Sequence, residues 1–300
     1  MAQIHINRIL FATDFLESSR LALDYAVALA NHFQATIEML HVLELSVAAA
    51  EAETLGQKQS HMRHMAVERI NSLAEGVRRL GITVEVRIED GIPANVILAA
   101  TKSDHIDLLV LGIHGVHRGI DHLLIGSNTE RILLAATCPT LTVGAHVLSG
   151  VDIHLHFDEI IYFSDFTPEA AAAAAYAVFF SKEFHAPIEV CQLSPRASES
   201  GERVQQKLVD EYCNSMKRAL DGEDSEWCKP AFHLERGMET DQMIERAQNQ
   251  HAGLIILGVR TASQLARHLH TSFAYRLLAG ATCPVLSISR AGAETDEGKV

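Results

Sequence analysis

A glycine-bearing loop contains the residues whose types and spacing are best suited to chemistry in this chain. Gly112 ends a short apolar run, Gly115 follows it, and Gly126 directly precedes Ser127 and an apolar segment. Glycine lets the backbone approach a ligand closely and adopt a positive φ. A helix start offers N–H groups and the positive end of the helix dipole. A strand, a glycine loop and a helix in this order predict an anion site, with Ser127 as a hydroxyl cap and an additional donor.

The same glycines also have an ordinary structural interpretation, and the loop alone does not separate the two. Glycine after a strand is common, and Gly-Ser before a helix is ordinary capping. The loop is not a P-loop, because no lysine follows its last glycine, and it lacks the G-x-G-x-x-G fingerprint. We expect its histidines (His114, His117 and His122) to lie near a ligand rather than to bind a metal, since no H-E-x-x-H motif occurs.

An internal repeat divides the chain into two similar halves. Residues 9–15 match residues 160–166, residues 105–112 match 251–258, and residues 138–143 match 283–288. Matching blocks in the same order indicate a duplicated domain. We predict a first domain over residues 1–146 and a second over residues 157–290, with a linker at residues 145–157.

Each copy is predicted to alternate strands with helices. The predicted strands are residues 8–12, 36–42, 83–88, 108–111 and 140–143 in copy one, and 159–163, 188–192, 231–235, 254–257 and 285–288 in copy two. The predicted helices are residues 17–32, 57–80, 93–100 and 130–136 in copy one, and 168–183 and 202–220 in copy two. This order predicts an α/β fold in which each copy forms a five-stranded parallel sheet with helices on both faces.

Composition and charge limit the classes of partner. The net charge of −13 argues against nucleic acid and against an anionic membrane surface. No apolar segment is long enough to span a membrane, and the first residues carry no signal-peptide pattern, so we expect a cytoplasmic protein. The five cysteines are scattered without a C-x-x-C pair, which is typical of buried thiols in a reducing compartment.

Several dispersed motifs together resemble the universal stress protein family in its tandem form. They are residues 12–15 (ATDF), 40–42 (LHV), the Gly112-x-x-Gly115 loop, Gly126-Ser127 and residues 138–143 (CPTLTV). The resemblance implies two tandem Rossmann-like domains of the adenine nucleotide alpha hydrolase type. In the family's motif, nine residues separate the second glycine from the Gly-Ser pair. In this chain, ten residues separate Gly115 from Gly126.

The resemblance also implies an adenine-nucleotide site in copy one, taking ATP with or without magnesium. By the family's pattern, Asp14 would hold the ribose hydroxyls, and Ala12 and Val42 would flank the adenine. The residues around the phosphates would be Gly112, His114, Gly115, Gly126, Ser127 and Asn128. A competing interpretation of Asp14 is a cap or turn role at the helix that begins near residue 17.

Copy two has lost most of this pattern. Thr261 stands where Gly115 stood, and Thr271-Ser272 replaces Gly126-Ser127. A β-carbon at these positions would crowd a phosphate, so we expect copy two to be structural and not to bind ATP in the usual way. By the family's pattern, residues 140–143 would pair with residues 285–288. That pairing would give an intramolecular pseudo-dimer and cover two sheet edges, and two such chains could associate as a homodimer.

We therefore favour a nucleotide-binding stress-response or regulatory protein over three alternatives. The first alternative is an enzyme, at most a slow ATPase, since no P-loop lysine and no clear general base beyond Asp14 and the loop histidines are present. The second is a partner-binding pseudo-dimer that uses no nucleotide. A metal-responsive protein that uses the histidines is the weakest of the three.

Overall fold

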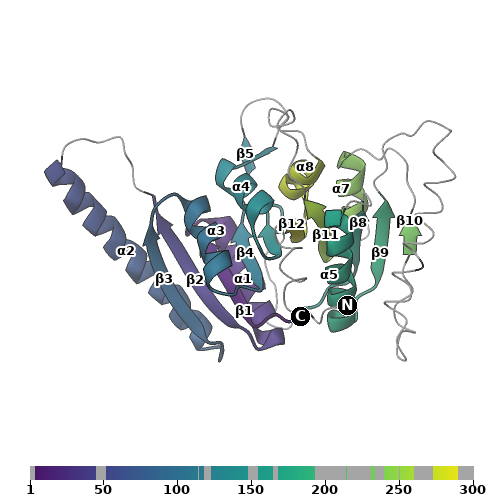
Figure 1. Cartoon of the computed structure of the whole chain (residues 1–300), viewed down its shortest axis with the longest axis horizontal. Helices are drawn as coiled ribbons and strands as arrows, with labels where there is room; N and C mark the ends of the chain where they lie inside the picture. The colour runs from purple at the N-terminus through teal and green to yellow at the C-terminus, as the bar shows by residue number, and fades with distance from the viewer. Residues whose placement is uncertain are drawn as a thin grey trace.

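The computed structural model describes residues 4–44, 52–113, 115–117, 123–147, 155–164, 168–192, 214, 231–233, 240–249, 251–259 and 273–289. In this part of the chain, ten strands form one sheet in the order β10-β9-β8-β11-β12-β7-β4-β1-β2-β3, and β5 pairs with β6 in a separate small sheet. Figure 1 shows the first half of the chain, in purple to teal, beside the second half, in green to yellow.

The first half forms the parallel five-stranded sheet that the sequence predicts. Its strands in the large sheet are β1 (Arg8–Thr13), β2 (Thr36–Leu43), β3 (Val84–Asp90), β4 (Leu108–Gly112) and β7 (Thr140–Val143). Its helices are α1 (Glu17–Phe33), α2 (Ala52–Arg78), α3 (Pro93–Ser103) and α4 (Ser127–Ala135). The strands pair in the order β3-β2-β1-β4-β7, always parallel. Helix α2 begins five residues before the predicted residue 57, because alanine and glutamate in that segment are good helix formers.

The second half repeats this arrangement. Its strands are β8 (Ile160–Ser164), β9 (Ile188–Gln192), β10 (Ala231–His233), β11 (Leu254–Val259) and β12 (Val285–Ser289). Its described helices are α5 (Pro168–Phe184), α7 (Thr240–Asn249) and α8 (Phe273–Gly280). The strands pair in parallel in the order β10-β9-β8-β11-β12. Apart from residue 214, the helix predicted at residues 202–220 lies outside the described residues.

The two halves join through their last strands, as predicted. Strand β12 pairs with β7 in the antiparallel sense, with Val285 opposite Thr142 and Ser287 opposite Thr140. The Thr142 hydroxyl also donates a hydrogen bond of 3.1 Å to the carbonyl of Val285. Two edge strands thereby satisfy each other's backbone groups, and the result is one continuous sheet.

Each face of the sheet carries an apolar core that extends across both halves. Strand β1 shows the alternation, because Ile9 and Phe11 belong to the core beneath α1 and α2, whereas Leu10 and Ala12 belong to the core beneath α3 and α4. Helix α5 contributes to the first core, and α7 and α8 contribute to the second. In the described residues, no helix combines the length and apolar character needed to cross a membrane.

Aromatic side chains form a second connection between the halves, where α1 and α5 end. The rings of Phe33 and Phe179 stack with centroids 5.6 Å apart, and the ring of His32 stacks on Phe184 at 4.3 Å. Nε2 of His32 lies 3.5 Å from the carboxylate of Glu183. The ends of the linker predicted at residues 145–157 are also buried, through Val147 and Phe157. The halves therefore share side-chain packing as well as a sheet.

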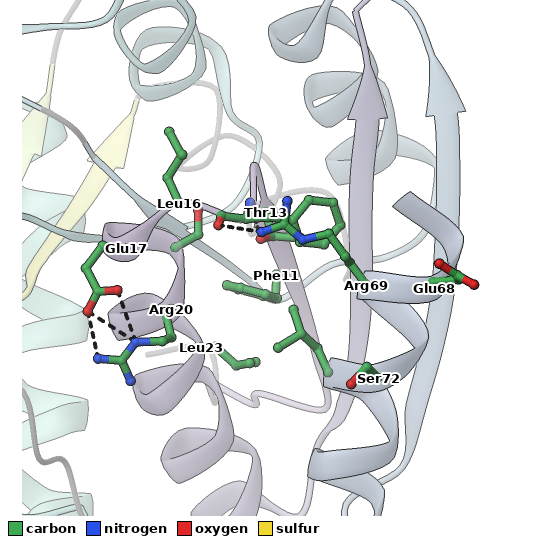
Figure 2. Close-up of a pocket in the computed structure, with 12 residues that line it drawn as sticks. Phe11, Thr13, Leu16, Glu17, Arg20, Leu23, Glu68, Arg69 and Ser72 are labelled. Carbon is green, nitrogen blue, oxygen red and sulfur yellow. Dashed lines mark hydrogen bonds and ion pairs between the residues drawn. The ribbon is translucent and has the colours of Figure 1, made fainter. Parts of the chain in front are cut away.

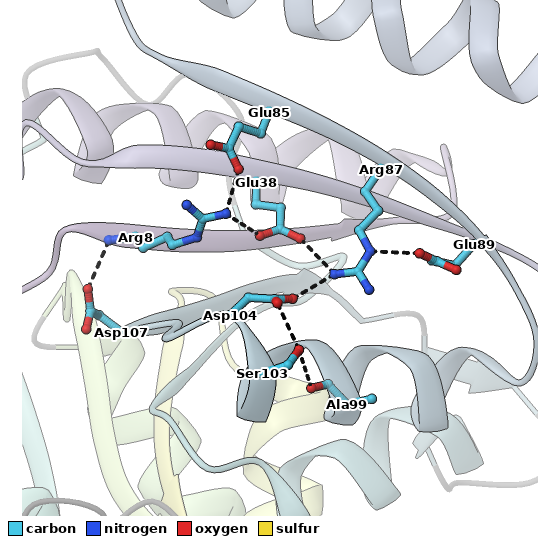
Figure 3. A network of polar contacts seen from close by, with 9 residues as sticks. All are labelled: Arg8, Glu38, Glu85, Arg87, Glu89, Ala99, Ser103, Asp104 and Asp107. Atoms are coloured by element: carbon cyan, nitrogen blue, oxygen red, sulfur yellow. Dashed lines mark hydrogen bonds and ion pairs between the residues drawn. The ribbon is translucent and has the colours of Figure 1, made fainter.

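A buried carboxylate fixes the strands of the first half (Figure 3). The side chain of Glu38 on β2 is 4% exposed and accepts hydrogen bonds from Arg8 on β1, at 2.9 Å, and Arg87 on β3, at 3.3 Å. Arg87 also donates to Glu89 and, at 2.7 Å, to Asp104 beyond α3. The hydrogen bond with Glu89 is the largest cause that raises the pKa of Arg87. This ionic cluster sets the positions of three adjacent strands relative to α3.

Replacing Glu38 tests the strength of this cluster. Glu38→Ala is expected to lower the free energy of unfolding by about 2–4 kcal/mol, because it leaves two arginines without their shared acceptor. We place the range below that of a fully buried pair because the side chains of Arg8 and Arg87 are 31% and 35% exposed. Urea denaturation measures the change. Glu75→Ala, which removes an exposed 3.8 Å pair with Arg79, is the control and should change little; equal losses in the two variants would contradict this account.

Candidate functional site

Four predicted site residues of the first half lie at the ends of β1, β2 and β4, on the carboxyl edge of the sheet: Ala12, Asp14, Val42 and Gly112. Strand β1 lies between β2 and β4, with Ala12 opposite both Leu40 and Leu111. The chain leaves β1 toward α1 on one face, and it leaves β4 toward α4 on the other. This is a topological switch point, where open α/β sheets bind ligands.

Asp14 follows β1 directly and holds the turn into α1. Its Oδ1 accepts a 2.9 Å hydrogen bond from the backbone N–H of Leu16 and a short hydrogen bond from the Ser19 hydroxyl. The N-cap position of α1 is Leu16, which makes no side-chain cap. The turn role that competed for Asp14 is therefore observed. Because Asp14 remains exposed at the edge of the sheet, its ribose role stays a prediction.

Ala12 and Val42 lie on the α3 face of the sheet, at the ends of adjacent strands. Ala12 is 7% exposed and Val42 is half-buried, and both belong to the core beneath α3 and α4. The backbone N–H of Gly91 donates to the carbonyl of Leu43 at 3.0 Å, which brings Ile92 to the end of β2. Ile92 is 50% exposed, and sequence reasoning missed it. Its signal was an apolar residue directly before the proline that opens α3.

Gly112 is required by packing. A β-carbon on Gly112 would lie 2.3 Å from the backbone carbon of Ser18, in the first turn of α1. Gly258, its counterpart in the second half, would place a β-carbon 2.4 Å from the backbone of Glu169 in α5. In both halves glycine thus allows a helix to approach a strand end closely. A phosphate is not needed to explain Gly112, and its phosphate role stays a prediction.

The segment between Gly112 and Gly126 contains structure that the sequence reading did not predict. Residues Gly115–His117 form β5 and residues Leu123–Ile125 form β6, which pair in the antiparallel sense with Gly115 opposite Ile125. The predicted glycine loop therefore contains two short strands that the sequence analysis did not predict. The local signal was only a short apolar run at residues 123–125, directly before Gly126. His114 and residues 118–122, which include His122, lie outside the described residues.

Helix α4 begins at Ser127, so the predicted hydroxyl cap was wrong. The N-cap is Gly126, which has no side chain, and Ser127 and Asn128 form the first helical turn. Serine sits one position too far along the chain to cap, because the cap residue must have extended backbone geometry. The first N–H groups of an α-helix have no partner within that helix. A β-carbon on Gly126 would meet nothing within 4 Å, so the approach to this helix start is open there.

Arg131 is a cation near this helix start that sequence reasoning missed. It is the only lysine or arginine within α4, four residues after Ser127. Its Nη2 donates to Oδ1 of Asn95 on α3 at 2.6 Å. This contact ties the start of α3 to the first turns of α4.

A groove of about 440 Å³ lies on the opposite face of the sheet, between α1 and α2 (Figure 2). Phe15 lines this groove, and its ring lies 4.4 Å from the ring of His41 and 4.6 Å from the guanidinium of Arg69. Arg69 also donates to the carbonyl of Phe15 at 3.3 Å. Phe15 has a left-handed φ of 64°, and these contacts hold it there. The groove is distinct from the predicted site, but its wall fixes the loop that carries Asp14.

The described cysteines offer no reactive nucleophile. Cys138, Cys191 and Cys283 are buried thiols, and burial raises the pKa of Cys138 and of Cys283 to about 12. Those two thiols stay protonated at neutral pH. Among the described residues, no group of three or more His, Cys, Asp or Glu side chains is arranged to hold a metal ion.

Comparison with known proteins decides the family. The model of the universal stress protein family matches this chain twice, at residues 5–144 and 156–289. The chain belongs to the universal stress protein family. A universal stress protein of Methanocaldococcus jannaschii is 27% identical over 142 residues, covering 46% of this chain and 81% of that protein. A homologue of universal stress protein A from Coxiella burnetii is 32% identical over 146 residues, covering 47% of this chain and 97% of that protein.

A solved structure matches the whole chain. The crystal structure of a universal stress protein from Archaeoglobus fulgidus is 20% identical, with a TM-score of 0.72, and the match covers 95% of this chain and 98% of that one. At this identity the likeness shows the fold alone. Together with the two family matches, it identifies a tandem universal stress protein with Rossmann-like halves.

Alanine substitutions distinguish glycines that are required by close backbone packing from glycines that have free space around them. Gly112→Ala is expected to lower the free energy of unfolding by about 1–3 kcal/mol, because the added carbon would overlap backbone atoms that cannot move independently. Gly258→Ala should behave in the same way. Gly126→Ala should cost no more than about 1 kcal/mol, the difference between glycine and alanine as an N-cap. Urea denaturation of the three variants checks this, and Gly112→Ala with wild-type stability would contradict it.

Proposed function

We propose that this universal stress protein binds one ATP at the carboxyl edge of its first half and acts as a stress-response or regulatory protein. The observation that carries the proposal is an exposed carboxylate, Asp14, directly after β1 at the β1–β4 switch point, where the chain leaves β1 for α1 on one face and leaves β4 for α4 on the other. A carboxylate suits ribose hydroxyls, and a helix start suits phosphates. The known fold of the family supports the same location.

In the proposed complex, Ala12 and Val42 contact the adenine and Asp14 accepts hydrogen bonds from the ribose. Ile92 extends the same apolar surface at the end of β2. The phosphates lie against backbone N–H groups and side chains of Gly112, His114, Gly115, Gly126, Ser127 and Asn128. With a net charge of −13, the chain provides no broad basic field, so local backbone dipoles supply most of the attraction. Arg131 is the nearby described cation that could add to it.

Binding, rather than rapid turnover, fits these residues. The chain has no P-loop lysine, and the described cysteines are buried. A bound nucleotide would then act by favouring one conformation over another, in proportion to its difference in affinity for the two. A slow ATPase is the limit of the activity that we propose. We assign copy two a structural role, because its counterparts of Gly115 and Gly126 are threonines.

One observation favours the second candidate, a partner-binding protein that uses no nucleotide. Asp14 and Gly112 each have a sufficient internal role, in the turn before α1 and in the packing of α1 on β4. Retention of these two residues therefore does not require a ligand. The two candidates differ in one measurable property, the presence of bound nucleotide.

The first experiment is the nucleotide content of the purified full chain. The protein is denatured, and the supernatant is separated by ion-exchange chromatography. We expect adenine nucleotide near one per chain, because the second half lacks the glycines. ADP or AMP in place of ATP would favour slow hydrolysis. A protein that is isolated empty and does not bind added ATP would establish the nucleotide-independent alternative.

A bulky residue at Gly126 should block the phosphates without harming the fold. Gly126→Val is expected to weaken ATP binding at least tenfold, about 1.4 kcal/mol, because its side chain enters the open approach to α4. Isothermal titration calorimetry measures the affinity. Gly76→Val is the matched control, since a β-carbon at Gly76 on α2 also meets nothing within 4 Å. Unchanged ATP affinity in Gly126→Val would mean that the phosphates bind elsewhere.

The ribose role of Asp14 can be separated from its turn role. Asp14→Asn keeps an oxygen acceptor for the N–H of Leu16 and the hydroxyl of Ser19, so the turn should persist. Loss of the carboxylate should weaken ATP and adenosine about equally, by roughly three- to tenfold, since charged hydrogen bonds are the stronger ones. Equilibrium dialysis with both ligands tests this. If both affinities stayed at the wild-type value, Asp14 would have the turn role alone.

A further inference from the structure

The two halves share one apolar core beneath the proposed phosphate-binding elements. This core contains Ile113, which follows β4, and Ile132 and Leu133 of α4. It also contains Leu277 and Leu278 of α8, which belong to the second half. All five side chains are at most 3% exposed. The base of the glycine segment and the helix after it therefore share an apolar core with α8, and α4 itself contacts β12 of the other copy.

Gly144 lies where these elements meet. A β-carbon on Gly144 would be 3.5 Å from the carbonyl oxygen of Leu278, 3.8 Å from that of Ala281, and 4.0 Å from Cγ1 of Ile113. These are ordinary contact distances, so one carbon fits but a longer side chain does not. Gly144 thus sets the spacing between the end of α8 and the base of the glycine segment.

Two further contacts connect the second half to the same region. Strand β6, which directly precedes Gly126, packs against α8. Figure 1 shows β5, α4 and α8 together at the same end of the sheet. At the other end of α4, the hydroxyl of Ser289 on β12 donates a 2.5 Å hydrogen bond to the carbonyl of Ala136. The second half therefore contacts the strand before Gly126 and also the C-terminal end of α4.

We propose that α8 of the second half is a positioning element for the phosphate side of the nucleotide site in the first half. This inference rests on the proposed function, and it gives the second half a role in binding although its own loop has lost the glycines. The adenine and ribose side, formed by Ala12, Asp14 and Val42, belongs to β1 and β2. Those strands are separated from β12 by β4 and β7. A displacement of α8 should therefore weaken the binding of the phosphates and leave the affinity for the nucleoside unchanged.

A substitution at Gly144 tests the inference in the full chain. Gly144→Leu should push α8 away from Ile113 and weaken ATP binding about tenfold, within the range usual for coupling between sites. Adenosine affinity should stay within about twofold of the wild-type value, because adenosine has no phosphate to place. Gly144→Ala is the matched control and should keep both affinities, since one carbon fits. Calorimetric titration with ATP and adenosine gives the comparison.

Hydrogen exchange of the wild-type chain tests the same inference without a variant. ATP should slow exchange in residues 123–125 and also in α8, whereas adenosine should slow neither, and α7 is the internal control.

The inference is overturned if ATP protects residues 123–125 but not α8, or if Gly144→Leu binds ATP as tightly as the wild type. It is also overturned if ATP and adenosine affinities fall together in Gly144→Leu. A wild-type chain that binds neither ligand would instead refute the proposed function, and the inference with it.

Discussion

The antiparallel pairing of β7 with β12 is the interaction on which the rest of the structure depends. Each half ends its sheet with a strand whose backbone groups on one side would otherwise face solvent. Pairing these two edges makes a ten-stranded sheet, and both apolar cores can then continue across the junction. The contacts of α1 with α5, and of α4 and β6 with the second half, follow from that junction. A single edge pairing thereby determines which helices of one copy meet those of the other.

Several residues at the carboxyl edge have a structural role that is sufficient by itself. Asp14 accepts a hydrogen bond within the turn before α1, and Gly112 allows the backbone of α1 to approach β4 closely. The ring of Phe15 contacts His41 and Arg69. Gly126 differs, because open space surrounds the position of its absent β-carbon. It is therefore the most informative position in the motif, since a substitution there tests the proposed ligand site without a steric conflict in the fold.

The duplication has produced halves with the same architecture and different loops. Both keep glycine at the end of the fourth strand of the copy, where a helix leaves no room for a β-carbon, and both keep a buried glutamate on the second strand. Glu38 is bound by Arg8 and Arg87, whereas Glu189 is bound by Arg246. The fold thus preserved packing and buried charge in both copies. The two copies differ after the fourth strand, where threonines stand in the second copy at the positions of Gly115 and Gly126.

The sequence by itself determined the repeat, the family and the positions of the strands in the large sheet, because these depend on local apolar periodicity and on motifs that are read along the chain. Strand ends were accurate to within two residues, since Gly, Pro and charged residues mark them locally. The tertiary structure decided what depends on distant residues: that Gly112 must admit Ser18, that residues 123–125 pair with residues 115–117 and pack on α8, and that Gly126 rather than Ser127 occupies the N-cap. The packing of Gly112 on Ser18 and of residues 123–125 on α8 cannot be read from a local pattern, because each depends on backbone segments from elsewhere in the chain.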